Sequence, residues 1–169
     1  PLSLKVSEGE IVGVAGLVGA GRTELLQTIF GVTPALGGSL EISGEVKEIR
    51  NPRAAISEGI ALAPEDRKQH GLVLPMSVRE NSSLPSLQRD ASRGWLNENA
   101  ERAVTQNAVK SMKIKTPNFE QMARFLSGGN QQKIVLGKWW SRDPPMTDPY
   151  LRDTCGSVLR AHLGPALRR

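Results

Sequence analysis

Residues 16–23 combine three glycines with a cation and a hydroxyl group. They read GLVGAGRT, which is the phosphate-binding pattern G-x-x-x-x-G-K-[ST] with Arg22 in place of the lysine. Glycines let the backbone turn tightly, so that consecutive N–H groups converge on phosphate oxygens, and the Thr23 hydroxyl is suited to ligate Mg²⁺. Arg22 keeps the positive charge and donates two N–H groups to phosphate, although its planar fork is bulkier than an ammonium group. The alternative is a glycine-rich packing turn without a ligand.

A second candidate site follows at residues 126–133, LSGGNQQK. The Ser127 hydroxyl and the free N–H groups of Gly128 and Gly129 at the start of a helix would suit an anionic oxygen. The alternative is an ordinary helix capped by a serine. The presence of both motifs in one chain favours a phosphate-binding interpretation of each.

The first loop needs a strand before it and a helix after it. Residues 10–15, EIVGVA, predict a strand buried on both faces. Apolar residues at helical spacing predict a helix from Arg22 to Phe30, with Gly31 as its C-terminal cap.

The rest of the chain supplies shorter elements. Alternation over residues 39–49 predicts an antiparallel pair of strands, Asn51 and Pro52 predict the start of a helix over 54–58, and residues 60–63 predict a buried strand. Ser77 and Glu80 have the spacing of a capping box.

Two longer helices are predicted, over residues 98–112 and 130–140. The apolar face of the first comprises Ala100, Ala103, Val104, Ala108, Val109 and Met112. Beyond Trp140 the chain is rich in proline, shows no strand-like run, and has only a weak helical pattern over residues 158–163.

Composition indicates an ordinary soluble protein, with 38% hydrophobic and 23% charged residues. The single cysteine, Cys155, forms no internal disulfide and suits a reducing compartment. A net charge of +5 raises the possibility of nucleic-acid binding, but the basic residues are scattered among acidic ones and only one Tyr and three Phe are present for stacking on bases. We therefore expect no nucleic-acid partner.

Three motifs together identify a family. Over residues 1 to about 144, GRTELL at 21–26, PEDRKQHGLVLPMSVREN at 64–81 and LSGGNQQK at 126–133 resemble the second, C-terminal ATP-binding half of ABC-type ATPases of ribose, galactose and xylose-type importers. In that half an arginine commonly stands at the position of Arg22. The resemblance implies an α/β fold, a P-loop NTPase of the ABC ATPase type with a mixed sheet core and a helical subdomain, here incomplete at both ends.

The resemblance also implies a division of the chain and a set of ligands. Residues 1–70 would be the nucleotide-binding core, 71–125 the helical subdomain that docks on the permease, 126–144 the signature and its helix, and 145–169 an atypical tail. The cofactors would be ATP and Mg²⁺, with Thr23 as the metal ligand. The implied nucleotide-binding residues are Gly16, Leu17, Val18, Gly19, Ala20, Gly21, Arg22, Thr23, Glu24, Glu65, Ser127, Gly128, Gly129 and Gln131.

Within this set the resemblance assigns distinct roles. Glu65 stands where most relatives have a glutamine that senses the γ-phosphate; a carboxylate reaches a metal or water but donates no hydrogen bond when ionised. The signature would face a nucleotide held by a second ATPase half. The other partners would be membrane permease subunits and, indirectly, a periplasmic sugar-binding protein. The protein would lie peripherally on the cytoplasmic face of the inner membrane, or in the cytoplasm if unassembled.

One part of the family pattern is missing. The family places four apolar residues ending in Asp-Glu after the signature helix, where the Asp helps to bind Mg²⁺ and the Glu polarises the attacking water. Residues 141–155 read SRDPPMTDPYLRDTC instead, and the run IALAPED at 60–66 precedes the signature rather than following it. We interpret Asp143, Asp148 and Asp153 as surface or turn acids rather than metal ligands. The family also has a later histidine; His162 is present but stands in no matching context.

No catalytic residue is therefore assigned. We expect residues from about 145 onward to be a frameshifted or fused translation, and we expect this chain alone to bind ATP without hydrolysing it. By family it would be an ATPase that couples ATP hydrolysis to sugar import. The alternative is a catalytically inactive nucleotide-binding module that regulates a partner ATPase.

Overall fold

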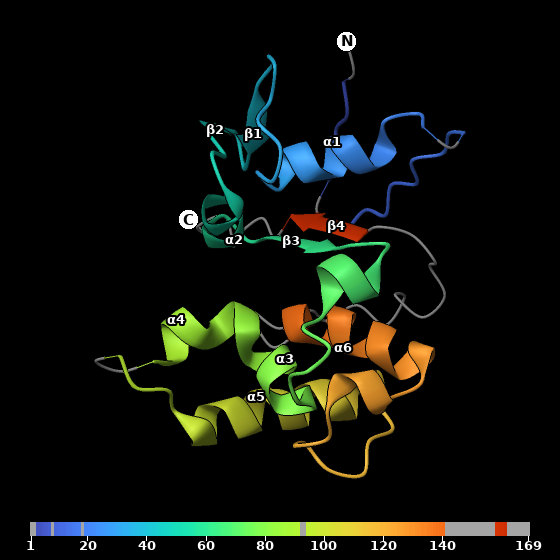
Figure 1. Cartoon of the computed structure of the whole chain (residues 1–169). Coiled ribbons are helices and arrows are strands. Elements are labelled where there is room, and N and C mark those ends of the chain that lie inside the picture. The colour runs from blue at the N-terminus through green and yellow to red at the C-terminus, as the bar shows by residue number, and fades with distance from the viewer. Residues whose placement is uncertain (1–2, 8, 18, 92–93, 141–157, 162–169) are drawn as a thin grey trace. The chain divides into compact units, whose positions relative to one another are not determined.

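The computed structural model describes residues 3–7, 9–17, 19–91, 94–140 and 158–161. The chain forms two compact units (Figure 1). One comprises Pro1–Leu62 with Ser157–Arg169, and the other comprises Ala63–Gly156. We call them the loop unit and the helical unit, and describe each by itself.

In its described residues, the loop unit contains two short helices with capped ends. α1 spans Arg22–Ile29 and ends in Phe30 and Gly31, where Gly31 has a φ of 76° and donates to the carbonyl of Thr28 at 3.0 Å. α2 spans Pro52–Ser57, and the side chain of Asn51 accepts from the N–H of Ala54 at 3.0 Å. Both predicted helices and their caps are confirmed.

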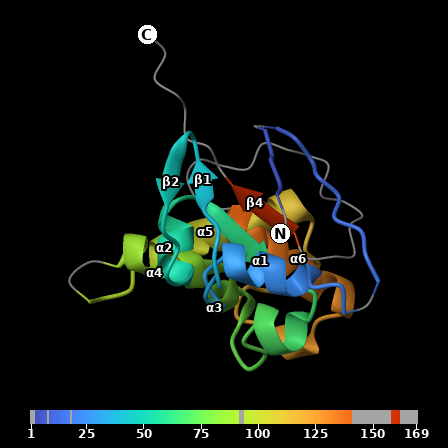
Figure 2. The same cartoon turned by 90° about the horizontal axis from the view of Figure 1, so that it is seen from above.

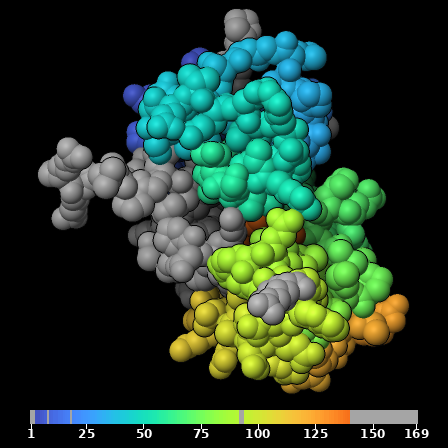
Figure 3. Space-filling view, turned by 90° about the vertical axis from the view of Figure 1, so that its left-hand side faces the viewer, coloured from blue at the N-terminus to red at the C-terminus, as the bar shows by residue number. Residues whose placement is uncertain are grey.

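The strands that the structure describes in the loop unit form two pairs. β1 (Leu40–Ile42) and β2 (Glu45–Lys47) are antiparallel and lie side by side in Figure 2. β3 (Ile60–Ala63) pairs with β4 (Val158–Ala161). The β1–β2 hairpin is largely exposed, as the cyan surface in Figure 3 shows, and only Ile42 in it is buried. The strands predicted at 39–49 and 60–63 are confirmed.

Two predictions for this unit are wrong. Residues 10–15 form no strand; Ile11 is 72% exposed and Val14 42% exposed. Neither of the two ladders in the described part of the chain includes them, and a strand cannot form without a neighbour that takes its backbone hydrogen bonds. Residues 158–161, where we predicted a weak helical pattern and no strand, form β4. A short apolar run by itself is compatible with either a helix or a strand. Here the pairing with β3, which is distant in the sequence, makes residues 158–161 a strand.

The helical unit begins with the π-helical turn Arg67–Gly71 and continues through five α-helical and 3₁₀ segments before the last helix. These are α3 (Val78–Ser83), the 3₁₀ turn Leu84–Ser86, α4 (Leu87–Asp90), α5 (Glu98–Met112) and the 3₁₀ turn Ala123–Phe125. The last helix, α6, spans Gly128–Trp140 and so starts two residues earlier than predicted. The helices α3, α5 and α6 each pack against the other two.

The core between these helices contains polar as well as apolar side chains. Val104 and Ala108 of α5 are buried as predicted, but Ala103 is exposed. Glu101 and Thr105, at 3% and 0% exposed, take places on the buried face. The spacing of apolar residues therefore predicts the buried face of α5 only in part. A carboxylate such as that of Glu101 can be buried there because side chains of another helix pair with it.

In the described part of the chain, no helix has both the length and the apolar character needed to cross a membrane.

Candidate functional site

Two glycines give the first candidate loop its shape. Gly19 and Gly21 have φ values of 83° and 78°, in the left-handed region that side chains other than glycine rarely adopt. The N–H of Ala20 donates to the carbonyl oxygen of Leu17 at 3.0 Å and closes the turn between them. The loop therefore curls back on itself immediately before α1.

The start of α1 leaves backbone donors free. The N–H of Leu25 bonds to the carbonyl of Gly21 at 2.9 Å, which makes it the first N–H of the helical ladder. The N–H groups of Arg22, Thr23 and Glu24 precede that ladder and have no partner within the helix. These donors and the positive end of the helix dipole suit a phosphate group.

The side chain of Arg22 turns back across the loop toward Gly16. A Cβ atom on Gly16 would lie 3.6 Å from Cδ and 3.8 Å from Nε of Arg22, and 3.0 Å from the Cβ of Ala20. Glycine at position 16 thus leaves room for the arginine stem. Both Arg22 and Thr23 are exposed, so their polar groups are accessible to a ligand.

The second candidate segment is the start of α6 in the helical unit. The N–H of Gln131 donates to the carbonyl of Ser127 at 2.9 Å, so the N–H groups of Gly128, Gly129 and Asn130 precede the helical ladder. The Asn130 side chain donates to the Ser127 hydroxyl at 3.0 Å and accepts from the N–H of Lys115 at 2.9 Å. The serine hydroxyl is thereby held at the end of the helix.

The segment 64–71 reaches the same end of α6. Its Glu65 is exposed, whereas the Asp66 carboxylate accepts from the N–H groups of Gln69 and Lys68, which lowers the pKa of Asp66. Arg67 Nε donates to Oε1 of Gln131 at 3.3 Å. The structure therefore brings Arg67, to which no sequence motif assigns a role, to the signature. Arg67 lies inside the PEDRK motif, in which the family resemblance assigns a role to Glu65 alone.

Two further contacts join segment 64–71 to α6. Gly71 packs so closely that a Cβ on it would lie 2.9 Å from Cγ2 of Val135. The ammonium group of Lys138 donates to the carbonyl of Gly71 at 2.7 Å, and burial lowers the pKa of Lys138 to about 8.

Backbone hydrogen bonds fix the segment that leads into the signature. The N–H groups of Val78 and Arg79 donate to the carbonyls of Gln121 and Phe119, each at 2.9 Å. In return, the N–H of Ala123 donates to the carbonyl of Met76 at 2.9 Å. The approach to α6 is thus paired with the approach to α3.

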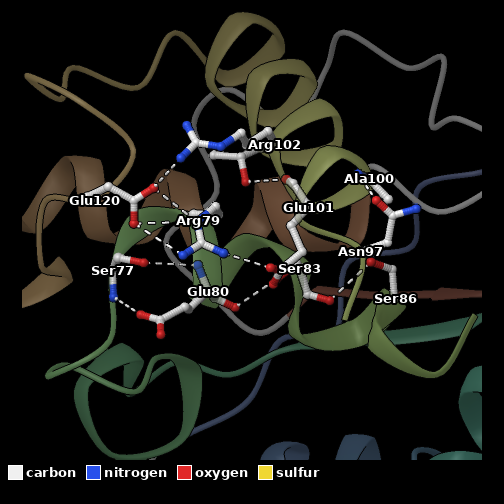
Figure 4. Close-up of polar contacts among 11 residues, drawn as sticks. Ser77, Arg79, Glu80, Ser83, Ser86, Asn97, Ala100, Glu101, Arg102 and Glu120 are labelled. Carbon is white, nitrogen blue, oxygen red and sulfur yellow. Dashed lines mark hydrogen bonds and ion pairs between the residues drawn. The ribbon is translucent and has the colours of Figure 1, made fainter. Parts of the chain in front are cut away.

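An ionic network reinforces this pairing (Figure 4). Arg79 lies between two carboxylates, with Nη1 at 2.6 Å from Glu101 Oε2 and Nε at 3.0 Å from Glu120 Oε1. Glu101 also accepts from the Ser83 hydroxyl at 2.7 Å, and the exposed Arg102 contacts Glu120 at 3.3 Å. The network ties α3, α5 and the loop before the signature together.

The predicted site residues thus fall into two groups. The loop at 16–24 lies in the loop unit, whereas Glu65 and the signature residues lie in the helical unit, where Arg67 and Gln131 join the two segments. Val18 is outside the described residues. Among the residues that the structure describes, no group of three or more His, Cys, Asp or Glu side chains is placed to hold a metal ion.

Comparison with known proteins gives relatives over most of the chain. The chain is 47% identical to the ribose import ATP-binding protein RbsA 2 of Escherichia coli O157:H7 over 144 residues, which are 85% of this chain and 28% of that protein. It is 46% identical to the ribose import ATP-binding proteins RbsA of Geobacillus kaustophilus and Rhodopirellula baltica, again over 85% of this chain and over 29% and 28% of those proteins. The chain therefore spans less than a third of the length of these curated relatives.

The family model described as "ABC transporter" matches residues 1–147. This match confirms the predicted fold class, a P-loop NTPase of the ABC ATPase type. On the strength of the match and of these relatives, the chain belongs to the ABC transporter family.

Proposed function

We propose that residues 16–24 bind the phosphates of ATP together with Mg²⁺. The observation that carries this proposal is the geometry of the loop: two left-handed glycines turn the backbone into the first turn of α1, where three N–H groups lack helical partners. The Arg22 guanidinium would add positive charge beside those donors. The Thr23 hydroxyl, exposed at the second residue of α1, would be the protein's ligand to Mg²⁺.

The signature would serve a second nucleotide. The free N–H groups of Gly128 and Gly129 and the adjacent Ser127 hydroxyl offer donors to phosphate oxygens. We propose that this nucleotide is held by a second ATPase half, because members of the ABC transporter family, to which the chain belongs, close two such halves around shared ATP. Glu65, exposed and two residues before Arg67, would respond to the γ-phosphate or its metal.

For the whole protein we propose the role of the ATP-binding subunit of a sugar importer. The relatives that are 46–47% identical are ribose import ATP-binding proteins, which supports a simple sugar as the cargo. The subunit would associate with membrane permease subunits on the cytoplasmic side, and a periplasmic sugar-binding protein would deliver the sugar. ATP binding and hydrolysis would be coupled to transport.

A second candidate differs in its chemistry. Residues 141–155 contain no apolar run that ends in Asp-Glu, so no acid in this stretch matches the one that would polarise the attacking water. On this ground we propose, as the alternative, a nucleotide-binding module without hydrolytic activity that regulates a partner ATPase.

MgATP titration of the purified chain tests the binding proposal. Binding of a fluorescent ATP analogue should saturate in the presence of Mg²⁺, weaken at least tenfold in Arg22→Ala, and change by about threefold or less in Arg22→Lys, because a single charged phosphate contact contributes about 1.5–3 kcal/mol. Arg53→Ala is the matched control, since Arg53 is an exposed arginine on α2 of the same unit. Equal losses in Arg22→Ala and Arg53→Ala would contradict the assignment of the loop.

Phosphate release separates the two candidates. Mg²⁺-dependent turnover by this chain alone would favour the ATPase and exclude the inactive module. Binding without turnover, which we expect, would favour the module for the isolated chain.

A further inference from the structure

The guanidinium group of Arg67 lies against the first residue of the signature helix. A Cβ atom on Gly128 would lie 2.8 Å from Nη2 and 3.4 Å from Cζ of Arg67. Real Cβ atoms do not approach other atoms this closely, so any side chain at position 128 would displace the guanidinium. The cost of a side chain at position 128 therefore depends on what holds the end of the Arg67 side chain in place.

Arg67 is not free to move away without cost. Its Nε donates to Oε1 of Gln131, a residue that is only 5% exposed. The amide nitrogen Nε2 of Gln131 donates to the carbonyl of Ala123 at 3.0 Å, and this second hydrogen bond fixes the orientation of the side-chain amide. Displacing Arg67 would leave Oε1 of Gln131 buried without a partner, and such a group destabilises the folded state.

The same arginine belongs to the segment that carries Glu65. Asp66 caps the turn Arg67–Gly71 by accepting from the N–H groups of Lys68 and Gln69, which holds the backbone on both sides of Arg67. At the far end of the turn, Lys138 and Val135 bind Gly71 to α6. The turn Arg67–Gly71 is thus attached to α6 at both of its ends.

We propose that Arg67 is a positioning residue that links Glu65 to the signature. Through its contact with Gly128 and its hydrogen bond to Gln131, it makes the Glu65 segment and the first turn of α6 move as one body. A displacement of either one is transmitted to the other. The inference rests on the proposed function only for the roles of Glu65 and Gly128, and its test needs no nucleotide.

A double-mutant cycle on the full chain tests the link. Gly128→Ala should raise the equilibrium constant for unfolding in urea about tenfold relative to Gly129→Ala, because it breaks the Arg67–Gln131 hydrogen bond. Gly129→Ala is the matched control: it also places alanine in the first turn of α6, but its Cβ would meet nothing within 4 Å. In an Arg67→Ala background the two alanine variants should agree within about twofold.

A spectroscopic measurement distinguishes positioning from general stabilisation. In ¹H–¹⁵N spectra of the folded chain, Gly128→Ala should shift the Glu65 amide resonance by several linewidths, and Gly129→Ala should leave it in place. The shift should vanish in the Arg67→Ala background and in Arg67→Lys, because lysine keeps the charge but lacks the planar group and the Nε–H.

Several results would overturn the link. They are equal effects of the two alanine variants in the native background, a difference between them that persists without Arg67, or a Glu65 resonance that does not respond to Gly128→Ala. Failure of MgATP to bind would leave this result standing and would refute only the proposed function. Conversely, ATP binding without coupling between positions 67 and 128 would refute only the link.

Discussion

Arg79 Nη1 lies 2.6 Å from Oε2 of Glu101, whose side chain is only 5% exposed. Glu101 is therefore a buried carboxylate whose charge is compensated by one arginine and one serine hydroxyl. Removing one partner of a buried pair leaves the other charge uncompensated in a medium that solvates it poorly.

We expect Arg79→Met to lower the free energy of unfolding by about 3 kcal/mol. Arg102→Ala is the matched control, because Arg102 also contacts a glutamate but its side chain is 54% exposed, and exposed pairs contribute about 0–1 kcal/mol. Urea unfolding followed by circular dichroism measures both variants. Equal losses would show that Glu101 finds another partner when Arg79 is absent.

Lys138 makes the stability of the helical unit depend on pH in the alkaline range. Its pKa is about 8 in the folded chain against an ordinary value of 10.5. Below pH 8 the group is charged in both states. Between pH 8 and about 10.5 the unfolded chain binds more protons than the folded chain, so the contribution of this group to the unfolding free energy rises with pH.

Lys138→Met should remove that rise. The unfolding free energies of the native chain and of the variant, measured from pH 7 to pH 9.5, should diverge in favour of the native chain as the pH increases. Parallel curves over this range would mean that the folded chain does not lower the pKa of Lys138. Lys133→Met provides a control, because Lys133 is a lysine of the same helix that donates to an exposed carbonyl, that of Lys113.

Asn81 holds the loop between the turn Arg67–Gly71 and α3. Its side chain is fully buried; it accepts from the N–H of Val73 at 2.9 Å and donates to the carbonyls of Val73, Met76 and Ser77. Asn81→Leu keeps the branched outline of the side chain but removes its polar atoms and leaves these groups unpaired, and we expect a loss of about 3 kcal/mol in unfolding free energy. Ser77→Ala, which removes one half of the capping box, should cost about 1 kcal/mol. The reverse ranking in urea unfolding would contradict the role assigned to Asn81.

Gly31 combines a left-handed backbone with a close neighbour. At a φ of 76°, a Cβ on Gly31 would lie 2.7 Å from the carbonyl carbon of Asn51. Gly44 has a φ of 82° but nothing within 4 Å of its Cβ position, so Gly44→Ala should cost only the backbone strain of about 1–2 kcal/mol. Gly31→Ala should cost clearly more, because backbone atoms of Asn51 cannot swing away as a flexible side chain would. Thermal unfolding of the two variants measures the difference.

Much of the local structure follows from neighbouring residues. Asn51 and Ser77 at helix starts, Gly31 at a helix end and the hairpin over residues 39–49 were all predicted, and all are present. Each depends on groups within a few positions of one another, so the sequence around them contains both partners. The capping box is an example, since Ser77 and Glu80 exchange two hydrogen bonds across three residues.

The motifs of the candidate site were equally visible. The glycine loop and its helix, with Arg22 and Thr23 at its start, occupy the predicted residues, and the family match bears out the resemblance on which their interpretation rested. The link through Arg67 was not visible, because Arg67 and Gln131 are 64 residues apart and nothing in either local pattern indicates the other.

The sequence by itself therefore determined the family, the caps, the turns and the positions of the two glycine-containing motifs at helix starts. Only the tertiary structure decided that residues 10–15 remain without a strand partner, that residues 158–161 pair with β3, that Glu101 is buried, and that Arg67 reaches Gly128. The physical reason is common to all four. A strand's hydrogen bonds, a buried charge's counter-ion and a glycine's close neighbour come from distant parts of the chain, which only folding brings together.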